Sequence, residues 1–226
     1  MRIKSITSRI VRLPVEEPLA GGPAYARSNN LFVTVRLETE DGIEGLGVTF
    51  FGGILSKTLK CAVEQLGELI LGGDPLQIDG ITQKLRTAGA SAGPGGILTL
   101  AISAIDMALW DIKGKYLGQP LGTMLGGLRD RVPTYASGAL VRAYSLDHLL
   151  KAAPLLVERG FRQMKTQLAL PGETTPEKEV ERARRVREAV GPDVDLMCDI
   201  NQRWSVHQAM EIGRRVEDVH FFGSKT

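Results

Sequence analysis

Hydrophobic and polar residues alternate along the first quarter of the chain, a pattern typical of half-buried β-strands. Residues 31–38 (LFVTVRLE) alternate cleanly, and residues 3–13 are rich in Ile, Val, Thr and Ser. An Asp-Gly pair at residues 41–42 is a turn signal before a third such segment, residues 43–51. The pattern predicts a three-stranded antiparallel meander with a surface loop over residues 18–30.

Helical spacing of apolar residues replaces this alternation in the next part of the chain. Predicted helices cover residues 55–71, 77–87 and 98–116. The third is the clearest, with apolar side chains at Leu100, Ile102, Ala104, Ile105, Ala108, Leu109 and Ile112. Gly118 and Pro120 then form a normal helix stop. The meander and the helices together predict an α+β domain over residues 1–125.

Short apolar segments alternate with helical segments from about residue 131 onward. Predicted strands cover residues 132–137, 161–168, 194–200 and 219–222. Predicted helices cover residues 145–159, 175–190 and 205–216. Thr175-Pro176 and the Ser205-x-x-Gln208 capping pattern are typical helix starts. This rhythm predicts βαβ units with a parallel sheet, and hence a second domain over residues 126–226.

The charge balance narrows the classes of partner. The chain has 28 basic and 26 acidic residues, a formal net charge of +2. This balance gives no basis for nucleic acid or an anionic membrane as the main partner, and no stretch of about 18 apolar residues predicts a membrane span. The basic run at residues 182–187 lies among Glu179, Glu181 and Glu188 in a helical pattern, which we interpret as a solvated helix face.

The two cysteines, Cys61 and Cys198, both lie in apolar contexts. We expect free, buried thiols in a reducing compartment rather than a disulfide. The three histidines are scattered and no Cys-x-x-Cys motif occurs, so a zinc site is not expected. The N-terminus lacks an apolar signal-peptide segment, which favours a cytoplasmic location.

Three stretches resemble the enolase superfamily, in particular its mandelate racemase/muconate lactonizing enzyme type. Residues 101–115 (AISAIDMALWDIKGK) are similar to the helix that ends the family's capping domain. Residues 160–167 (GFRQMKTQ) resemble its second barrel strand, and residues 199–201 (DIN) stand where its first metal ligand lies. The resemblance implies an N-terminal capping domain followed by an incomplete (β/α) TIM-type barrel, of which this chain supplies strands 1–3 and the start of strand 4.

Members of this superfamily bind Mg²⁺ and remove a proton next to a carboxylate. That proton is very weakly acidic, so a divalent metal on the carboxylate oxygens offsets the developing charge while a nearby Lys or His takes the proton. The resemblance therefore implies a lyase (acid-sugar dehydratase) or an isomerase (racemase). It also implies Mg²⁺ as cofactor, a small carboxylate substrate (a hydroxy acid or acid sugar) and a homo-oligomer.

Four residues on the barrel strands carry this implied chemistry. By resemblance Asp199 is the first Mg²⁺ ligand and Lys165 orients or polarises the substrate carboxylate; the alternatives are a turn-capping Asp and a surface Lys. Asn201 is either a polar contact near metal or substrate or a plain turn residue. Gln167 stands where many members have a second, proton-abstracting Lys, and an amide cannot take that role. Two-base racemisation through this strand is therefore less expected than a one-base reaction such as dehydration.

The loops of the first domain supply further candidates. By resemblance Tyr25, Arg27 and Phe50 lie in capping loops that close over substrate; each is otherwise a solvent-exposed loop residue. Trp110 and Asp111 are expected to join the two domains rather than to touch substrate.

The end of the chain departs from the family pattern. The family places a metal-ligating Glu after its fourth strand, about where this chain has Lys225. We therefore expect the chain to be inactive alone. The alternatives are a non-enzymatic fragment that associates with itself or a paralogue, and membership of an unrelated α/β family in which Lys165 and Asp199 are incidental.

Overall fold

The computed structural model describes residues 1–14, 18–22, 31–50, 54–172 and 174–225. The chain divides into two compact units. The N-terminal unit contains Met1–Val15 and Ala26–Asp130, and the C-terminal unit contains Glu16–Tyr25 and Arg131–Thr226. Leu19 and Ala20 accordingly pack against the core of the C-terminal unit, although they lie in the predicted loop of the first domain.

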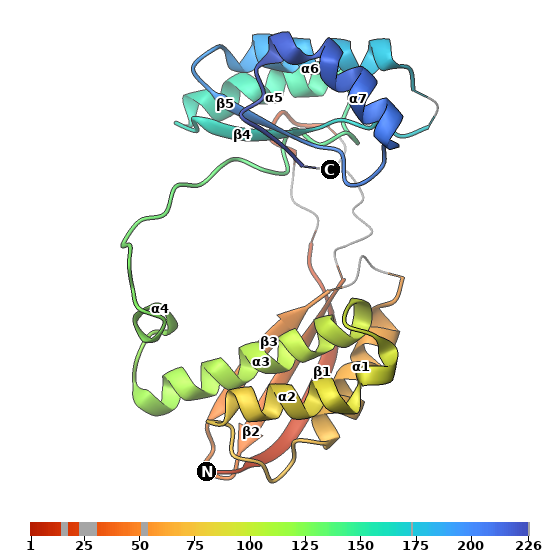
Figure 1. The fold of residues 1–226 in the computed structure, drawn as a ribbon. Helices are drawn as coiled ribbons and strands as arrows, with labels where there is room; N and C mark the ends of the chain where they lie inside the picture. Colours follow the sequence, from red (N-terminus) through yellow and green to blue (C-terminus); the bar gives the residue numbers. More distant parts are fainter. Residues whose placement is uncertain (15–17, 23–30, 51–53, 173, 226) are drawn as a thin grey trace. The chain divides into compact units, whose positions relative to one another are not determined.

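The N-terminal unit is an antiparallel sheet with helices on one face (Figure 1). Its strands, in spatial order, are β1 (Ile3–Arg12), β2 (Leu31–Thr39) and β3 (Glu44–Thr49). Its helices are α1 (Ser56–Glu68), α2 (Ile78–Ala88), α3 (Gly96–Leu117) and the short α4 (Leu121–Met124), with a 3₁₀ turn η1 (Ala90–Ala92). The predicted meander is confirmed, and the alternating side chains of β2 place Val33, Val35 and Leu37 in the core.

Helix α3 lies unusually close to β3 because small residues face each other. A Cβ added to Gly45 would lie 2.0 Å from the Ala108 carbonyl oxygen, and one added to Gly47 would lie 1.8 Å from the Ala104 oxygen. Glycine is therefore required at both positions, since the clash would be with backbone atoms that cannot rotate away. The helix ends where predicted, with Gly118 in the left-handed conformation (φ 62°).

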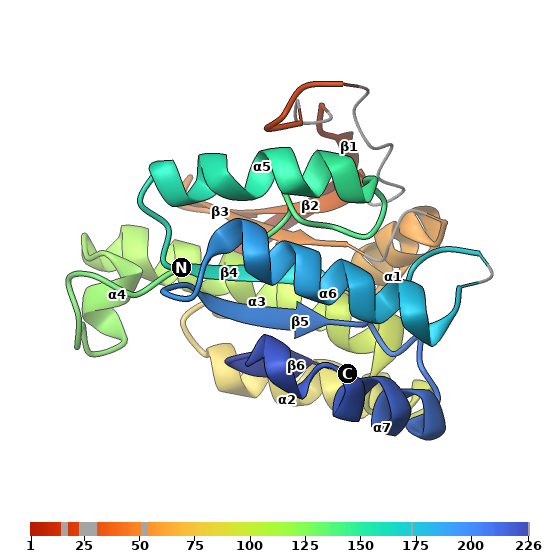
Figure 2. The ribbon, with the colours of Figure 1, turned by 90° about the horizontal axis from the view of Figure 1, so that it is seen from above.

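The C-terminal unit is a parallel β/α layer structure. Strands β4 (Gln163–Gln167), β5 (Asp195–Asp199) and β6 (Gly223–Lys225) lie in that order. Helix α5 (Leu146–Glu158) precedes β4, α6 (Pro176–Val190) connects β4 to β5, and α7 (Val206–Arg215) with the 3₁₀ turn η2 (Glu217–Val219) connects β5 to β6. Figure 2 shows α5 and α6 lying along β4 and β5. Ser145, Thr175 and Ser205 cap the three helices, and Ser205 forms the predicted capping box with Gln208.

One predicted strand is absent, and the predicted start of the last one lies a few residues too early, since β6 begins at Gly223. Residues 132–137 form only one isolated bridge, between Ala136 and Met164. Pro133 offers no backbone N–H, and the neighbouring residues are largely exposed rather than packed. Residues 219–222 are not a strand either, because η2 and a left-handed His220 (φ 50°) turn the chain first; pairing begins at Phe222, whose N–H donates to the Leu196 oxygen (2.9 Å).

Cys198 is buried as predicted, but Cys61 is exposed, because it lies on the solvent side of α1 between the buried Leu59 and Val63. None of the helices in the described ranges combines the length and the apolar character that a membrane span requires.

Candidate functional site

Lys165 and Asp199 meet at the carboxyl ends of two neighbouring parallel strands. In the β4–β5 register Gln167 lies opposite Asp199, and Lys165 lies two residues earlier on the same side of β4. The Lys165 Nζ is 3.4 Å from Asp199 Oδ2, and their side chains are 17% and 3% exposed. Helix-facing Met164 and Thr166 are fully buried, so alternation turns Lys165 and Gln167 to the opposite face of the sheet.

The turn after β5 brings Asn201 next to Asp199. Asn201 and Gln202 both have left-handed backbone conformations, with φ of 48° and 59°. The Asn201 N–H donates to Asp199 Oδ1 at 2.9 Å. One carboxylate oxygen of Asp199 is thus held by its own turn, while the other faces the Lys165 ammonium.

Arg142 also belongs to this cluster, although the sequence analysis did not identify it. It lies between the Ala136 bridge and α5 and is buried. Its Nη2 donates to the Asp199 carbonyl oxygen and to Asn201 Oδ1, both at 2.9 Å. Its backbone N–H donates to Gln167 Oε1 at 3.4 Å. Burial lowers the pKa of the Arg142 guanidinium, with a further lowering from the Arg203 charge. The signal in the sequence is an Arg directly after Leu140-Val141 in an otherwise apolar stretch.

Tyr135 adds an aromatic ring to the cluster. The Lys165 Nζ lies 5.3 Å from the centre of the Tyr135 ring, within the range of a cation–π interaction. Lys165 therefore contacts both a carboxylate and a ring face, and these contacts limit the positions its ammonium can take.

Helix α6 supports the cluster with two buried charges, which corrects the predicted solvated face at Glu179 and Arg182, whereas Arg184, Arg185 and Glu188 are exposed as predicted. Glu179 is fully buried and accepts hydrogen bonds from the N–H groups of Ala169 (3.0 Å) and Leu170 (2.8 Å). Arg182 donates to the Val141 and Tyr144 oxygens at 3.0 and 3.1 Å. Burial lowers the pKa of Arg182 to about 10. These bonds fix the loops that follow β4 and precede α5.

The described residues provide suitable chemistry for Mg²⁺ but an incomplete set of ligands. Asp199 supplies hard carboxylate oxygens, the type that Mg²⁺ prefers. Within the part of the chain that the structure describes, no three His, Cys, Asp or Glu side chains gather as a metal site. The backbone register places Lys225 beside Asp199, at the end of β6. The described residues alone therefore do not fit a complete Mg²⁺ site.

The predicted loop candidates lie elsewhere or outside the described residues. Tyr25 and Arg27 are outside the described residues. Phe50 follows β3 in the N-terminal unit, is half exposed, and its ring centre lies 5.7 Å from that of Phe32. The structure thus joins Lys165, Gln167, Asp199 and Asn201 in one cluster, and Phe50 belongs to a separate unit.

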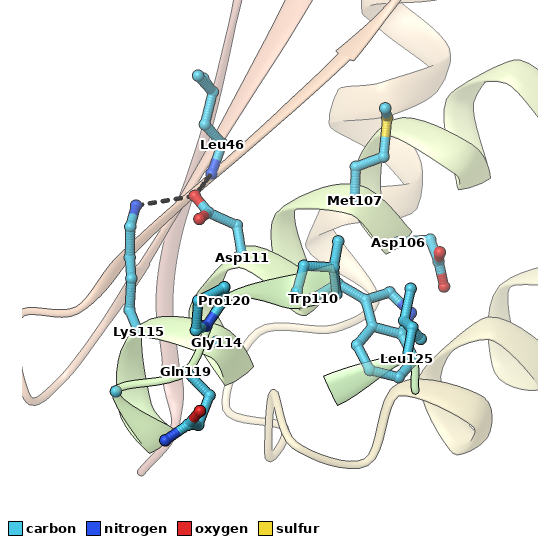
Figure 3. A pocket seen from close by; sticks show the side chains of 12 residues that line it. Leu46, Asp106, Met107, Trp110, Asp111, Gly114, Lys115, Gln119, Pro120 and Leu125 are labelled. Carbon is cyan, nitrogen blue, oxygen red and sulfur yellow. Dashed lines mark hydrogen bonds and ion pairs between the residues drawn. The ribbon is translucent and has the colours of Figure 1, made fainter. Parts of the chain in front are cut away.

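A hollow of about 960 Å³ lies in the N-terminal unit beside α3 (Figure 3). Trp110, Leu121 and Leu125 line it. Asp111 accepts hydrogen bonds from the Leu46 N–H and the Lys115 Nζ, both at 2.8 Å, as Figure 3 shows. Asp111 therefore ties α3 to β3 within this unit. The hollow is largely apolar.

Comparison with known proteins gives consistent matches along the chain. Residues 6–126 match the family described as mandelate racemase/muconate lactonizing enzyme, N-terminal domain. Residues 148–222 match the family described as enolase C-terminal domain-like.

Two curated relatives and one solved structure illustrate the similarity. The chain is 32% identical to an L-talarate/galactarate dehydratase of Salmonella typhimurium, over 96% of this chain and 55% of the relative. It is 33% identical to a 3,6-anhydro-alpha-L-galactonate cycloisomerase of Streptomyces coelicolor, over 99% of this chain and 62% of the relative. The structure of a Streptomyces coelicolor racemase with bound magnesium superposes with a TM-score of 0.83 at 30% identity, covering 97% of this chain and 61% of that one. The chain thus spans little more than half the length of these relatives.

Proposed function

Because the chain belongs to the mandelate racemase/muconate lactonizing enzyme family, we propose that it forms part of an enzyme that removes the proton α to the carboxylate of an acid sugar. The observation that carries this proposal is the contact between Lys165 and Asp199 at the carboxyl ends of adjacent parallel strands. Barrel enzymes hold their catalytic groups at this end of the strands. A partly buried Lys beside a buried Asp is costly unless it serves a site.

We assign a role to each residue of the cluster. Lys165 holds the substrate carboxylate through its ammonium, and its contact with the Tyr135 ring limits its movement. Asp199 would contribute one ligand to a Mg²⁺ ion, and the bound ion would offset the charge that develops on the substrate carboxylate. Further ligands have to come from outside the described cluster. Asn201 contacts a polar group of the substrate, and Tyr25, Arg27 and Phe50 remain candidates for closing over it.

Gln167 favours a one-base reaction over two-base racemisation. Its amide cannot accept a proton usefully near pH 7. Its Oε1 already accepts a hydrogen bond from the Arg142 N–H. We therefore place the proton-accepting base elsewhere than at Gln167. Dehydration of an acid sugar fits this arrangement, in agreement with the dehydratase among the relatives.

Metal titration tests the proposal at Asp199. A single carboxylate gives weak binding, so we expect a Kd for Mg²⁺ of about 1 mM or weaker, because this ion requires near-octahedral oxygen ligands. Asp199→Asn should abolish the binding measured by calorimetry. Lys165→Met should strengthen it, because the ammonium 3.4 Å from Oδ2 no longer competes with the cation. Unchanged affinity in Asp199→Asn would contradict the proposal.

Proton exchange tests the chemistry directly. The chain is incubated with Mg²⁺ in D₂O together with galactarate, L-talarate or 3,6-anhydro-L-galactonate, and deuterium at the α-carbon is followed by NMR. Any exchange should disappear in both Lys165→Met and Asp199→Asn. Exchange that persists in both variants would remove the proposed roles of these residues.

The apolar hollow beside α3 favours a second candidate, self-association of the N-terminal unit. Leu125 lines the hollow and is 64% exposed. Leu125→Asp should lower the average mass measured by light scattering, because it places a charge in an apolar contact. Leu71→Asp is the matched control, since Leu71 is exposed in the same unit but does not line the hollow. If the two variants have the same average mass in light scattering, the result would count against self-association through the hollow.

A further inference from the structure

We propose that Arg142 is a positioning residue that fixes the turn after β5, and with it the orientation of Asn201 and Asp199. The chemistry that this orientation serves rests on the proposed function. Arg142 reaches from the loop before α5 to the ends of β4 and β5. Through three hydrogen bonds it contacts Gln167, Asp199 and Asn201.

The contact with Arg142 decides which end of the Asn201 amide faces the cluster. A guanidinium can only donate hydrogen bonds, so the Asn201 atom 2.9 Å from Nη2 must be the carbonyl oxygen. The amide NH₂ group therefore points away from Arg142. Arg142 thus leaves Asn201 to act toward a ligand as a hydrogen-bond donor, suited to a hydroxyl or carboxylate oxygen.

Arg142 also stabilises an otherwise unfavourable backbone. Asn201 and Gln202 are consecutive residues with positive φ, a conformation that persists when the surroundings hold it from several sides. Here Arg142 binds the Asp199 carbonyl oxygen before the turn and the Asn201 side chain within it. The Asn201 N–H in turn binds Asp199 Oδ1. Releasing Arg142 should therefore alter the environment of the carboxylate as well as that of the amide.

The burial of Arg142 is difficult to explain by packing alone. Arg142 is 8% exposed, and its Nε has no hydrogen-bond partner among the described residues. A buried donor without a partner costs about 1–3 kcal/mol. An apolar side chain of similar length would fill the same space without that cost. What an apolar side chain cannot do is hold Asp199 and Asn201 through one donor nitrogen.

Arg187 provides a matched control within the same unit. It also donates to backbone carbonyls, those of Val219 (2.8 Å) and Val194 (2.7 Å) among them. Val194 precedes β5, whereas Asp199 ends it, so Arg187 acts at the opposite end of the strand. Arg187→Met removes a guanidinium and its carbonyl contacts but leaves the cluster in place.

The experiment compares ¹⁵N-labelled wild-type chain with Arg142→Met, Arg142→Lys, Arg187→Met and Asp199→Asn. Without metal, NMR follows the side-chain amide of Asn201 and the backbone amides of Asp199 and Asn201. Mn²⁺ is then titrated as a paramagnetic probe that broadens nearby signals. We expect Arg142→Met to shift the Asn201 signals and to weaken Mn²⁺ binding about 10-fold, as loss of a group that orients a metal ligand does.

The other variants separate positioning from general stability. Arg142→Lys should give shifts between those of wild type and Arg142→Met, because an ammonium on a shorter stem keeps part of the contact. Arg187→Met should lower the free energy of unfolding without shifting the Asn201 signals or the Mn²⁺ affinity. If Arg142→Met does not fold, shifted Asn201 signals in Arg142→Lys support the proposal and unshifted signals overturn it.

Unchanged Asn201 signals in Arg142→Met, or shifts of equal size in Arg187→Met, would also overturn the proposal. These outcomes are distinct from failure of the proposed function. If Asp199→Asn leaves Mn²⁺ binding unchanged, the metal role of Asp199 fails. The metal-free Asn201 signals still decide whether Arg142 positions the turn.

Discussion

The two units of this chain bury different kinds of polar group. Among the residues that the structure describes, the buried polar residues of the N-terminal unit are small hydroxyl side chains: Ser8, Thr39, Thr49 and Ser56. In the C-terminal unit they are Arg142, Thr166, Glu179, Arg182 and Asp199, four of which are ionisable. A buried hydroxyl is readily satisfied by one backbone partner, whereas a buried charge needs several hydrogen bonds or an opposite charge.

This difference indicates that polar groups in the C-terminal unit hold the candidate site, whereas the N-terminal unit is stabilised mainly by apolar packing. The N-terminal unit packs helices onto a sheet through glycine and alanine contacts between α3 and β3. The C-terminal unit instead uses Glu179 and Arg182 to hold the loops around Asp199 and Arg142. The charges of α6 support the geometry of the cluster, and they make this unit more sensitive to loss of a single polar side chain.

The largest expected effect is that of Glu179→Ala in the C-terminal unit. It leaves the N–H groups of Ala169 and Leu170 without their carboxylate partner. We expect a loss of about 4 kcal/mol in the free energy of unfolding, since each buried unsatisfied donor costs about 1–3 kcal/mol. Fluorescence of Trp204 in a Trp110→Phe background monitors this unit during denaturation. The control Glu181→Gln, at an exposed position of the same helix, should change stability by less than about 0.5 kcal/mol.

The next largest effect is expected from Gly47→Ala in the N-terminal unit. The added Cβ would lie 1.8 Å from the Ala104 oxygen, so α3 and β3 must separate. We expect a destabilisation of about 3 kcal/mol, the upper part of the range for overpacking. Trp110 fluorescence in a Trp204→Phe background reports on this unit.

Gly80→Ala is the control for that substitution. Gly80 lies in α2, and its nearest contact would be 4.0 Å away, so alanine should stabilise the unit by about 0.5–1 kcal/mol. If Gly47→Ala and Gly80→Ala change the free energy of unfolding in the same direction, the close approach of α3 to β3 does not stabilise this unit.

The smallest expected effect is a difference between the two free thiols in their reactivity toward a thiol reagent. Cys61 is exposed in the N-terminal unit, whereas burial raises the pKa of Cys198 to about 12 in the C-terminal unit. At pH 8 a thiol reagent should modify one cysteine of the native chain, and peptide mapping should locate it at Cys61. The second should react only after unfolding. Rapid modification of Cys198 in the native chain would mean that the C-terminal unit opens readily.

Local patterns in the sequence were sufficient to place most elements. The alternation in β2 and the helical spacing in α3 reflect burial of one face, and both elements occur where predicted. The helix caps at Ser145, Thr175 and Ser205 are also local, because the side chain bonds its own helix. The sequence also placed Lys165 and Asp199 near the ends of successive strands, and parallel pairing brings such ends together. The wrong strand at residues 132–137 shows the limit: apolar and Ser/Thr content favours a strand, but pairing requires a partner and a free N–H.

Only the tertiary structure decided which charged residues are buried. Glu179 and Arg182 look like members of a solvated charge run, yet helical spacing places them beside Val180, Ala183 and Val186 on the packed face. Their partners lie on loops far away in sequence, such as the Val141 and Tyr144 carbonyls that Arg182 binds. Arg142 was not identified for the same reason, since its contacts with Asp199 and Asn201 span 57 and 59 residues. A sequence pattern reports the local periodicity of burial, whereas the partners of a buried charge are fixed only when distant segments pack together.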